Sequence, residues 1–549
     1  SVRRRMIPLP VAPMILRRFA PLALLALAAA CAPAPAAGPT PVAGPLTRPE
    51  RSGYTQTSSY ADVVLFLDSL RMRGGAIHVD SLGATTEGRV IPYVVASRPL
   101  VRTAQEARRL GRPVVYLQGN IHAGEVEGKE ALQALLRDLV LSPGPNVLDS
   151  LVLVVVPIYN ADGNEAMGPQ ERQRTEQNGP AMVGQRPNAQ GLDLNRDYIK
   201  AEAPETQGAL ALFRAWAPEL IVDLHTTDGS YHGYALTYSP SLNPASGAAG
   251  AYTRDQLFPE LRRRVRERRR FETFDYGNFS LRYGADVNTD STREGWFTYD
   301  HRPRFGTNYY GLRGGLSVLG EAFSHDPFER RIRSTYAFVS ELLSLVAERS
   351  GEVMSVTGDA PAGATVPVRS ELTRSPYVGE VLAEVLESDP DSVPDEPGVH
   401  RGIRRTGRFR ALRMPVYDRF DPTLRRTPPA VYLLDAGQTD AVALLRRHGI
   451  AVETLAAERR VRGQAFVVDS IIRAARPFQG HHEVSLRGRW QPVERVASAG
   501  SFLVSTTQPL GTLAVYLLDP ESDDGLTTWN FFDPSLRLGA EHPSIAVER

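Results

Sequence analysis

The strongest constraint on the fold of this chain is a series of apolar runs that alternate with stretches of helical periodicity. "RPVVYLQGN" (112–120) and "LVLVVVPIYN" (151–160) are apolar over consecutive positions, as in strands that are covered on both faces. Between them, "VEGKEALQALLRDLVL" (126–141) repeats apolar residues at spacings of three and four, which indicates a helix. Alternating strands and helices predict a mostly parallel sheet with helices on both faces.

The same alternation continues and predicts one body over residues 59–351. Its later elements are a helix at 204–217, strands at 219–225 and 316–323, and a long closing helix at 328–350.

After this body the periodicity weakens. We interpret residues 352–429 as a connecting region, in which the acidic stretch 387–398 is rich in proline and is a loop. Residues 430–549 are predicted to form a smaller accessory domain that is mixed or β-rich. Within it, 430–455 has the pattern of a strand, a helix and a strand, and "GSFLVSTTQPLGTLAVYLLDP" (500–520) is interpreted as short strands.

The N-terminal segment has the layout of an export signal. An apolar run, 19–30, follows Arg17 and Arg18 and ends on small residues before Cys31, the chain's single cysteine. The run is shorter than the roughly 20 apolar residues that span a bilayer. Residues 1–31 resemble a bacterial lipoprotein signal whose thiol is acylated, although an ordinary signal peptide with an incidental cysteine also fits.

This interpretation predicts an exported protein, periplasmic or on the cell surface, anchored to a membrane by lipid at Cys31. Residues 32–58, rich in Ala, Pro and Gly, are predicted to be an extended tether. A single cysteine excludes intramolecular disulfides. The net charge of +1 over 549 residues gives no electrostatic reason to expect nucleic acid as a partner.

Residues with metal-binding chemistry follow the ends of the predicted strands. His122 and Glu125 come directly after the strand at 112–120, and His225 ends the strand at 219–225. Two imidazoles and one carboxylate are a catalytic zinc set, which leaves the fourth position open. A lone H-x-x-E pair is more often structural, so the interpretation depends on the other residues that accompany it.

Two further segments complete the pattern. "GLDLNRDY" supplies Asp193, Asn195 and Arg196, of which the aspartate could orient a zinc-bound imidazole and the arginine could hold a carboxylate through a two-point fork. The same segment also fits a helix start with an Asp cap and a surface Arg. Glu321 ends the strand at 316–323, where it could accept a proton from water at a zinc site.

In these residues, and in their order over roughly 60–350, the chain resembles the zinc carboxypeptidases typified by carboxypeptidase A. The resemblance implies a mixed, mostly parallel eight-stranded sheet between helices. It also implies that His122, Glu125 and His225 hold one Zn²⁺ per chain, that Asn195 and Arg196 bind the terminal carboxylate of the substrate, and that Glu321 is the general base.

Two family positions have several candidates. The arginine that stabilises the oxyanion is Arg172, Arg174 or Arg186, and Arg174 is favoured for its distance from Asn195. The mobile tyrosine of the family has no clean match. Tyr299, Tyr309 and Tyr310 compete for this place, with Tyr310 taken as the substrate-binding candidate.

The predicted reaction is removal of C-terminal residues from a peptide or amide substrate with a free carboxylate. One alternative is an amidohydrolase that acts on acylated amino acids or peptidoglycan peptides with the same site. Another is an inactive, peptide-binding lipoprotein. Among the other histidines, His481 and His482 are interpreted as structural rather than as a second metal site, and His232 as part of a pocket wall or surface.

Overall fold

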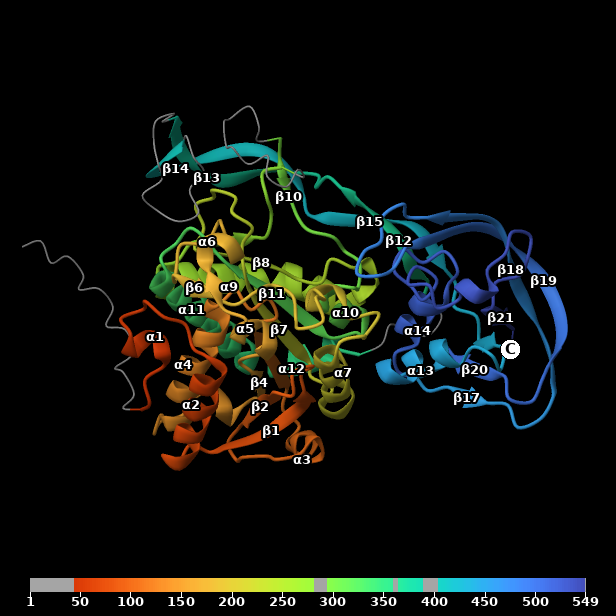
Figure 1. The fold of residues 1–549 in the computed structure, drawn as a ribbon, viewed down its shortest axis with the longest axis horizontal. Helices are drawn as coiled ribbons and strands as arrows, with labels where there is room; N and C mark the ends of the chain where they lie inside the picture. The colour runs from red at the N-terminus through yellow and green to blue at the C-terminus, as the bar shows by residue number, and fades with distance from the viewer. Residues whose placement is uncertain (1–43, 281–293, 359–363, 389–402, 549) are drawn as a thin grey trace, which may run out of the picture. The chain divides into compact units, whose positions relative to one another are not determined.

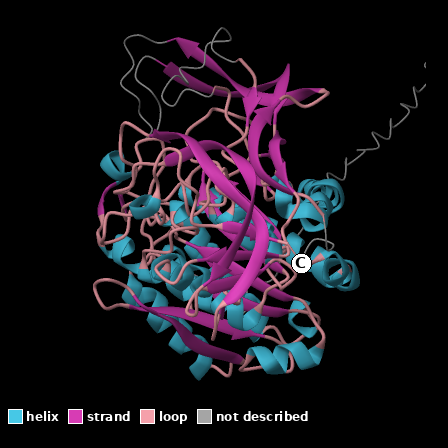
Figure 2. Ribbon diagram, turned by 90° about the vertical axis from the view of Figure 1, so that its right-hand side faces the viewer, coloured by secondary structure: helices cyan, strands magenta, loops and turns pink. Residues whose placement is uncertain are grey.

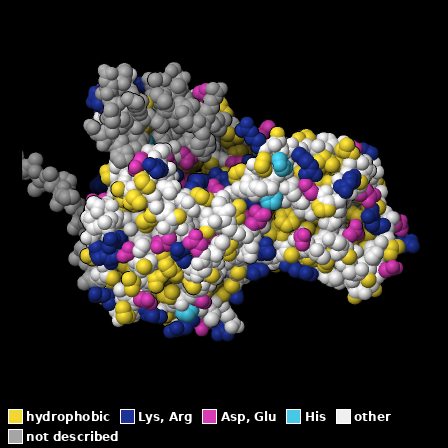
Figure 3. Space-filling model, viewed as in Figure 1, with side chains coloured by type: hydrophobic (Ala, Val, Ile, Leu, Met, Phe, Trp, Pro, Cys, Tyr) yellow, Lys and Arg dark blue, Asp and Glu magenta, His cyan; other side chains and the backbone are white. Residues whose placement is uncertain are grey.

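The computed structural model describes residues 44–280, 294–358, 364–388 and 403–548 (Figure 1). The predicted signal with Cys31, residues 32–43 of the predicted tether and most of the acidic loop 387–398 lie outside the described residues. In the part that is described, no helix has both the length and the apolar character needed to cross a membrane. Basic and acidic side chains are interspersed on the face drawn in Figure 3, consistent with the net charge of +1.

Within the described residues, eight strands form one mixed sheet, as predicted. The four central strands run parallel to one another, whereas β1, β2 and β8 pair antiparallel to a neighbour. The strands lie in the order β1 (Ile77–Ala84), β2 (Val90–Ala96), β4 (Val152–Val156), β3 (Val114–Gly119), β7 (Leu220–Thr226), β11 (Leu316–Ala322), β8 (Leu236–Ser239) and β9 (Thr273–Asp275).

Helices lie on both sides of these strands (Figure 2). Alternate residues of β3 point to opposite faces, so Val115 and Leu117 join one apolar core while Val114 and Tyr116 join the other. The first core is completed by α2 (Tyr60–Met72), α4 (Glu127–Leu141), α9 (Phe258–Arg264) and α11 (Phe328–Glu348). The second is completed by α3 (Ala104–Leu110), α7 (Pro204–Trp216) and α10 (Gly306–Leu312).

Short elements occupy the connections of this sheet domain, by which we mean residues 44–358. They include α5 (Ala161–Glu165), α6 (Gln170–Gln173), α8 (Gly247–Tyr252), α12 (Ser350–Val356), β5 (Gly168–Pro169) and β6 (Met182–Val183).

The described part of the predicted tether is folded rather than extended. Helix α1 (Arg48–Arg51) carries Glu50, which forms an ion pair with Arg137 of α4 at 2.7 Å. Ser58 donates a hydrogen bond of 2.6 Å to Glu130, also on α4. Residues 44–58 are therefore part of the sheet domain, a correction to the predicted tether over these positions.

The C-terminal domain, residues 430–548, is β-rich as predicted. Its described residues include a six-stranded sheet in the order β17 (Glu453–Thr454), β20 (Phe502–Ser505), β16 (Val431–Leu434), β21 (Ile545–Val547), β18 (Arg459–Arg473) and β19 (Val484–Ala497). Helix α13 (Thr439–His448) lies between β16 and β17, which confirms the predicted strand, helix and strand. The predicted strand at the end of 500–520 is wrong, because Gly511–Leu518 forms helix α14.

The connecting region also contains more structure than predicted. Strand β12 (Val366–Thr373) pairs with β15 (Arg419–Arg426), and β13 (Val378–Ser388) pairs with β14 (Ile403–Tyr417). Strand β10 (Trp296–Phe297) of the sheet domain extends the second ladder by pairing with β14. The described residues of 352–429 therefore contain paired strands that the sequence did not predict.

Candidate metal centre and active site

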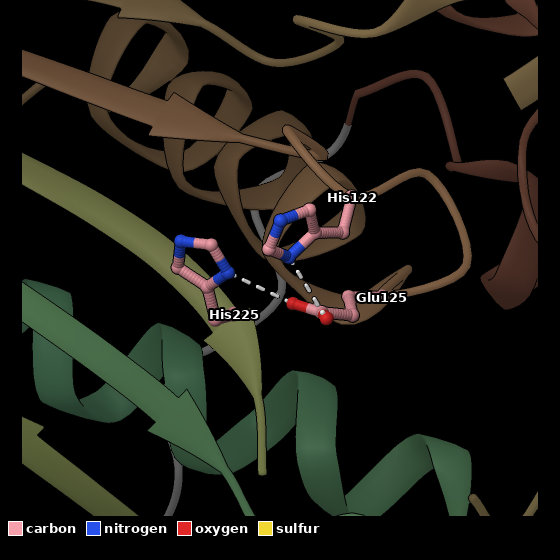
Figure 4. Close-up of side chains that lie close together, drawn as sticks. All are labelled: His122, Glu125 and His225. Carbon is pink, nitrogen blue, oxygen red and sulfur yellow. Dashed lines mark hydrogen bonds and ion pairs between the residues drawn. The ribbon is translucent and has the colours of Figure 1, made fainter. Parts of the chain in front are cut away.

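The three predicted metal ligands meet at the carboxyl edge of the parallel strands. His122 and Glu125 lie in the turn between β3 and α4, and His225 lies near the end of the neighbouring strand β7. One ligand atom from each lies within 4.8 Å of the others, and all three side chains are buried. Figure 4 shows both imidazoles turned toward the carboxylate. The turn is close-packed, since a Cβ on Gly124 would lie 2.8 Å from the side chain of Arg174.

The hydrogen bonds of the two histidines favour metal binding. Nδ1 of His122 lies 3.0 Å from Oε1 of Glu125, and Nδ1 of His225 lies 2.9 Å from Oε2. The opposite nitrogen, Nε2, lies 2.9 Å from Asp193 in the first case and 3.1 Å from Asp223 in the second. A carboxylate that accepts a hydrogen bond from Nε2–H fixes the tautomer and leaves Nδ1 available to a metal. The donor set and its supports therefore fit a zinc ion.

Electrostatics favour the charged forms of Glu125 and His225 in the protein interior. Burial opposes ionisation of Glu125, but the charges of His122 and Arg174 outweigh it and hold the pKa of the carboxyl well below its usual range. For His225, burial likewise opposes the charge, while Asp223 and Glu125 raise the pKa of the imidazole well above its usual range. These groups stabilise one another, as expected at a functional site.

Glu321 faces the same cluster from the next strand. Its position on β11 is paired in parallel register with His225 on β7, so the two side chains project to the same side of the sheet. The residue is 9% exposed. Burial raises the pKa of its carboxyl well above the usual range; His225 opposes this shift, whereas Glu125 adds to it.

The segment with Asp193, Asn195 and Arg196 combines the two interpretations that its sequence allowed. Asp193 caps the short 3₁₀ helix Leu194–Arg196 by accepting a hydrogen bond of 3.0 Å from the backbone of Asn195, and it also contacts His122. Burial opposes its ionisation, but His122 and Arg186 lower the pKa of the carboxyl below its usual range. The guanidinium of Arg196 lies 3.8 Å from the ring centre of Phe305.

A cavity joins these groups. Its walls are formed by His122, Glu125, Arg186, Asn195, Arg196, His225, Thr226, Asp228, Tyr276, Tyr299, Phe305, Thr307, Leu319 and Glu321. The cavity therefore brings together the predicted metal ligands, the predicted carboxylate-binding pair and the predicted base.

The arginine favoured from sequence is not in the cavity wall. Arg174 is buried beneath Glu125, where it forms an ion pair of 3.0 Å and donates to the backbone carbonyls of Thr226 and Thr227. Arg186, with 37% of its side chain exposed, lines the cavity and forms an ion pair of 2.9 Å with Asp193. Distance along the chain favoured Arg174, whereas the fold places Arg186 in the cavity wall.

The tyrosine taken from sequence, Tyr310, does not line the cavity either. Tyr310 is buried in α10, where its hydroxyl donates to the carbonyl of Pro218 and its ring packs on Phe213. Tyr299 lines the cavity instead, with its hydroxyl 2.8 Å from that of Thr307.

Sequence reasoning missed Tyr276 and Asp228. The hydroxyl of Tyr276 donates to Asp228 at 3.1 Å, and both residues line the cavity. Asp228 could have been predicted, because it is a carboxylate three residues after His225 at the end of a strand. The sequence around Tyr276 offers no such indication. Of the histidines set aside, His232 is buried against Phe323. His481 lies 2.8 Å from Glu202.

A helix-covered mixed sheet that holds two imidazoles and a carboxylate beside a second buried carboxylate defines a metal-dependent hydrolase. Residues 63–267 match the sequence model of the zinc carboxypeptidase family. Over these residues the sheet domain is similar to this family, and the match supports a zinc metallocarboxypeptidase. The matched range contains the metal ligands and Arg196 but ends before Glu321.

Similar proteins include "Carboxypeptidase 2" of Trichophyton tonsurans, 23% identical over 487 residues, which cover 84% of this chain and 81% of the relative. The protein of the same name from Trichophyton rubrum is 22% identical over 488 residues, with the same coverage of 84% and 81%. Among solved structures, carboxypeptidase A of Helicoverpa armigera is 16% identical with a TM-score of 0.38, over 54% of this chain and 75% of that one.

Proposed function

We propose that the protein removes single residues from the C-termini of peptides, with Arg196 and Asn195 binding the free carboxylate. The observation that carries this proposal is that Arg196 lines the same cavity as His122, His225 and Glu321. A guanidinium in that position would recognise the end of a chain, and binding the end fixes which peptide bond lies over the metal ligands. The enzyme would therefore act as an exopeptidase.

Zinc held by His122, Glu125 and His225 would supply Lewis-acid polarisation of the scissile carbonyl and activation of water. Glu321 acts as general base and acid: it accepts a proton from the attacking water and delivers it to the leaving amine. Arg186 faces the negative charge that develops on the carbonyl oxygen. We assign this role to Arg186 because Arg174 is buried away from the cavity wall.

The test uses purified protein, with zinc, and a mixed set of peptides in free-acid and C-terminally amidated forms, analysed by mass spectrometry with and without a chelator. We expect loss of single C-terminal residues from the free acids, abolished by the chelator. Glu321→Gln should retain about one zinc per chain and lose at least about 10²-fold in kcat, because the proton acceptor is absent.

Cleavage of amidated and free peptides alike would remove the carboxylate-binding role of Arg196. If neither set is cleaved while zinc is bound, an amidohydrolase acting on acylated amino acids or peptidoglycan peptides becomes the better hypothesis. A fully active Glu321→Gln enzyme would exclude the glutamate from the mechanism.

We also propose that the protein is exported and attached to a membrane by a lipid on Cys31, on the basis of the apolar run and small residues that precede this cysteine. Cys31→Ala should move the protein from the membrane fraction to the soluble fraction. An unchanged distribution between the two fractions contradicts the anchor.

A further inference from the structure

We propose that the C-terminal domain positions Arg196 in the active site. Gln479 and Trp529 of this domain act through Lys200, and Asp524 and Trp529 act through Arg304. The inference rests on the proposed function, in that it takes Arg196 to bind the carboxylate of the substrate. Two loops of the sheet domain carry the groups that contact this carboxylate site, and the C-terminal domain holds both.

The first loop is held through Lys200, which is 1% exposed. Its ammonium donates to the backbone carbonyl of Arg196 at 2.9 Å and to Oε1 of Gln479 at 3.1 Å. It also lies 4.4 Å from the ring centre of Trp529. In return, Nε2 of Gln479 donates to the carbonyl of Asp193 at 3.5 Å. Gln479 of the C-terminal domain thus contacts the backbone of Asp193 directly and that of Arg196 through Lys200.

The second loop is held through Arg304. Its guanidinium donates to Asp524 at 3.0 Å and to Glu483 at 2.7 Å, and its backbone amide donates to Asp524 at 2.7 Å. The guanidinium also lies 4.5 Å from the ring centre of Trp529, whose Nε1 donates to Asp524 at 3.0 Å. Cations from both loops therefore contact the same tryptophan.

The residues that follow Arg304 connect this anchor to the substrate site. The ring of Phe305 lies against the guanidinium of Arg196 at 3.8 Å, and the amide of Gly306 donates to Oδ1 of Asn195 at 2.9 Å. The orientation of Asn195 and Arg196 is thus set by two contacts: Lys200 holds the backbone of Arg196, and Phe305 packs on its guanidinium.

These anchors act through other residues and not on the substrate. Lys200, Arg304 and Gln479 are absent from the cavity wall as the structure describes it. The charges of Lys200 and Arg304 are buried and paired, so removal of a partner leaves an uncompensated group and displaces the loop. A guanidinium displaced by about 1 Å loses much of the benefit of a two-point contact, which should weaken substrate binding more than it slows the chemical step.

The test measures kcat and KM for a free-acid peptide with Gln479→Ala, Lys200→Met and Arg196→Met. Arg214→Met serves as the matched control, because Arg214 donates to the carbonyl of Arg446 across the same two domains without touching either loop. We expect Gln479→Ala and Lys200→Met to raise KM about tenfold with kcat changed less than about twofold, as uniform binding loss does. Lys200→Arg should restore most of the loss, and Arg214→Met should leave both constants unchanged.

The outcomes separate the two proposals. If Arg196→Met raises KM while Gln479→Ala and Lys200→Met do not, the positioning role is wrong and the proposed function stands. If Arg196→Met itself has no effect on KM, the carboxylate-binding role fails first. Because Lys200 is buried, its replacement also affects the stability of the protein. Gln479 is partly exposed, so Gln479→Ala decides the question, with its melting temperature measured alongside.

Discussion

Arg174 and Arg186 both contact Oε1 of Glu125, the proposed metal ligand, but only Arg186 lines the cavity. Arg174 lies 3.0 Å from Oε1 and is held by backbone carbonyls, whereas Arg186 lies 3.5 Å away with part of its guanidinium facing the cavity. The first is placed to fix the carboxylate of the ligand. The second is placed to meet charge that develops on a substrate.

The different surroundings of the two arginines predict that replacing Arg186 lowers activity, whereas replacing Arg174 lowers zinc binding. Arg186→Met should lower kcat by about 10²- to 10³-fold, as removal of an oxyanion donor does, while the zinc content stays near one per chain. Arg174→Met should lower the zinc content, because a buried carboxylate loses its counter-charge. Steady-state kinetics and metal analysis distinguish the two, with exposed Arg172→Met as the control. Full activity of Arg186→Met, or a fall in kcat for Arg174→Met with zinc retained, would reverse the assignment.

At this scale the sequence was most informative where chemistry and strand ends coincide. His122, Glu125, His225 and Glu321 could be predicted because the carboxyl ends of parallel strands bring side chains together. Tyr310 could not be excluded, since its burial depends on how α10 packs and two adjacent tyrosines look alike in sequence.

At the scale of elements, the last turn of α13 joins the two domains through a neutral histidine. His448 is buried; its Nδ1 accepts from the hydroxyl of Tyr309 at 2.8 Å, and its Nε2 donates to the carbonyl of Ile199 at 3.0 Å. Burial lowers the pKa of the imidazole to about 3, and the nearby charge of Arg313 acts in the same direction. The folded protein therefore keeps this ring uncharged at pH values where an unfolded chain protonates it.

Because the folded pKa is depressed, the contribution of His448 is fully present above about pH 6.5 and is lost as the pH falls toward 3. Between pH 7.5 and 5 the loss is about 2 kcal/mol of unfolding free energy. We expect His448→Gln to melt below the wild type at pH 7.5 and the difference to narrow at pH 5. Melting curves at both pH values check this, and a difference that stays constant or widens contradicts a neutral His448.

Two groups of elements, α14 and the strands of the connecting region, could not be predicted from the pattern of polar and apolar residues. Helix α14, "GTLAVYLL", contains a run of six apolar residues, and a run of this length fits a buried strand or a buried helix equally well. In β14 many side chains are exposed, and its arginines interrupt the alternation of polar and apolar residues that reveals a strand. The central strands of the sheet domain are buried on both faces and its long helices on one face. They were predictable because such burial leaves a continuous apolar run in a strand and a regular apolar spacing in a helix.

At the scale of the whole molecule, one apolar core crosses the boundary between the domains. Phe213 of α7 and Tyr309 of α10 belong to the same cluster of buried side chains as Leu445 of α13 and Val515 of α14. The second face of the eight-stranded sheet is thus covered by helices that are themselves covered by the C-terminal domain. A shared core makes the two domains one unit in thermodynamic terms.

This continuity predicts the behaviour of a shortened chain. A protein ending at Gly358 keeps every proposed metal ligand and Glu321, yet it exposes the outer sides of α7 and α10 and leaves Arg304 and Lys200 without their buried partners. We expect it to bind a hydrophobic dye, to aggregate and to melt without a sharp transition, because exposed apolar surface and unpaired buried charges each oppose folding. Co-expression of residues 364–549 as a separate chain should restore solubility by covering that surface. A shortened protein that is monomeric, melts sharply and cleaves peptides with unchanged kcat/KM would show that the sheet domain is independent, and it would overturn both the shared core and the positioning of Arg196 from the C-terminal domain.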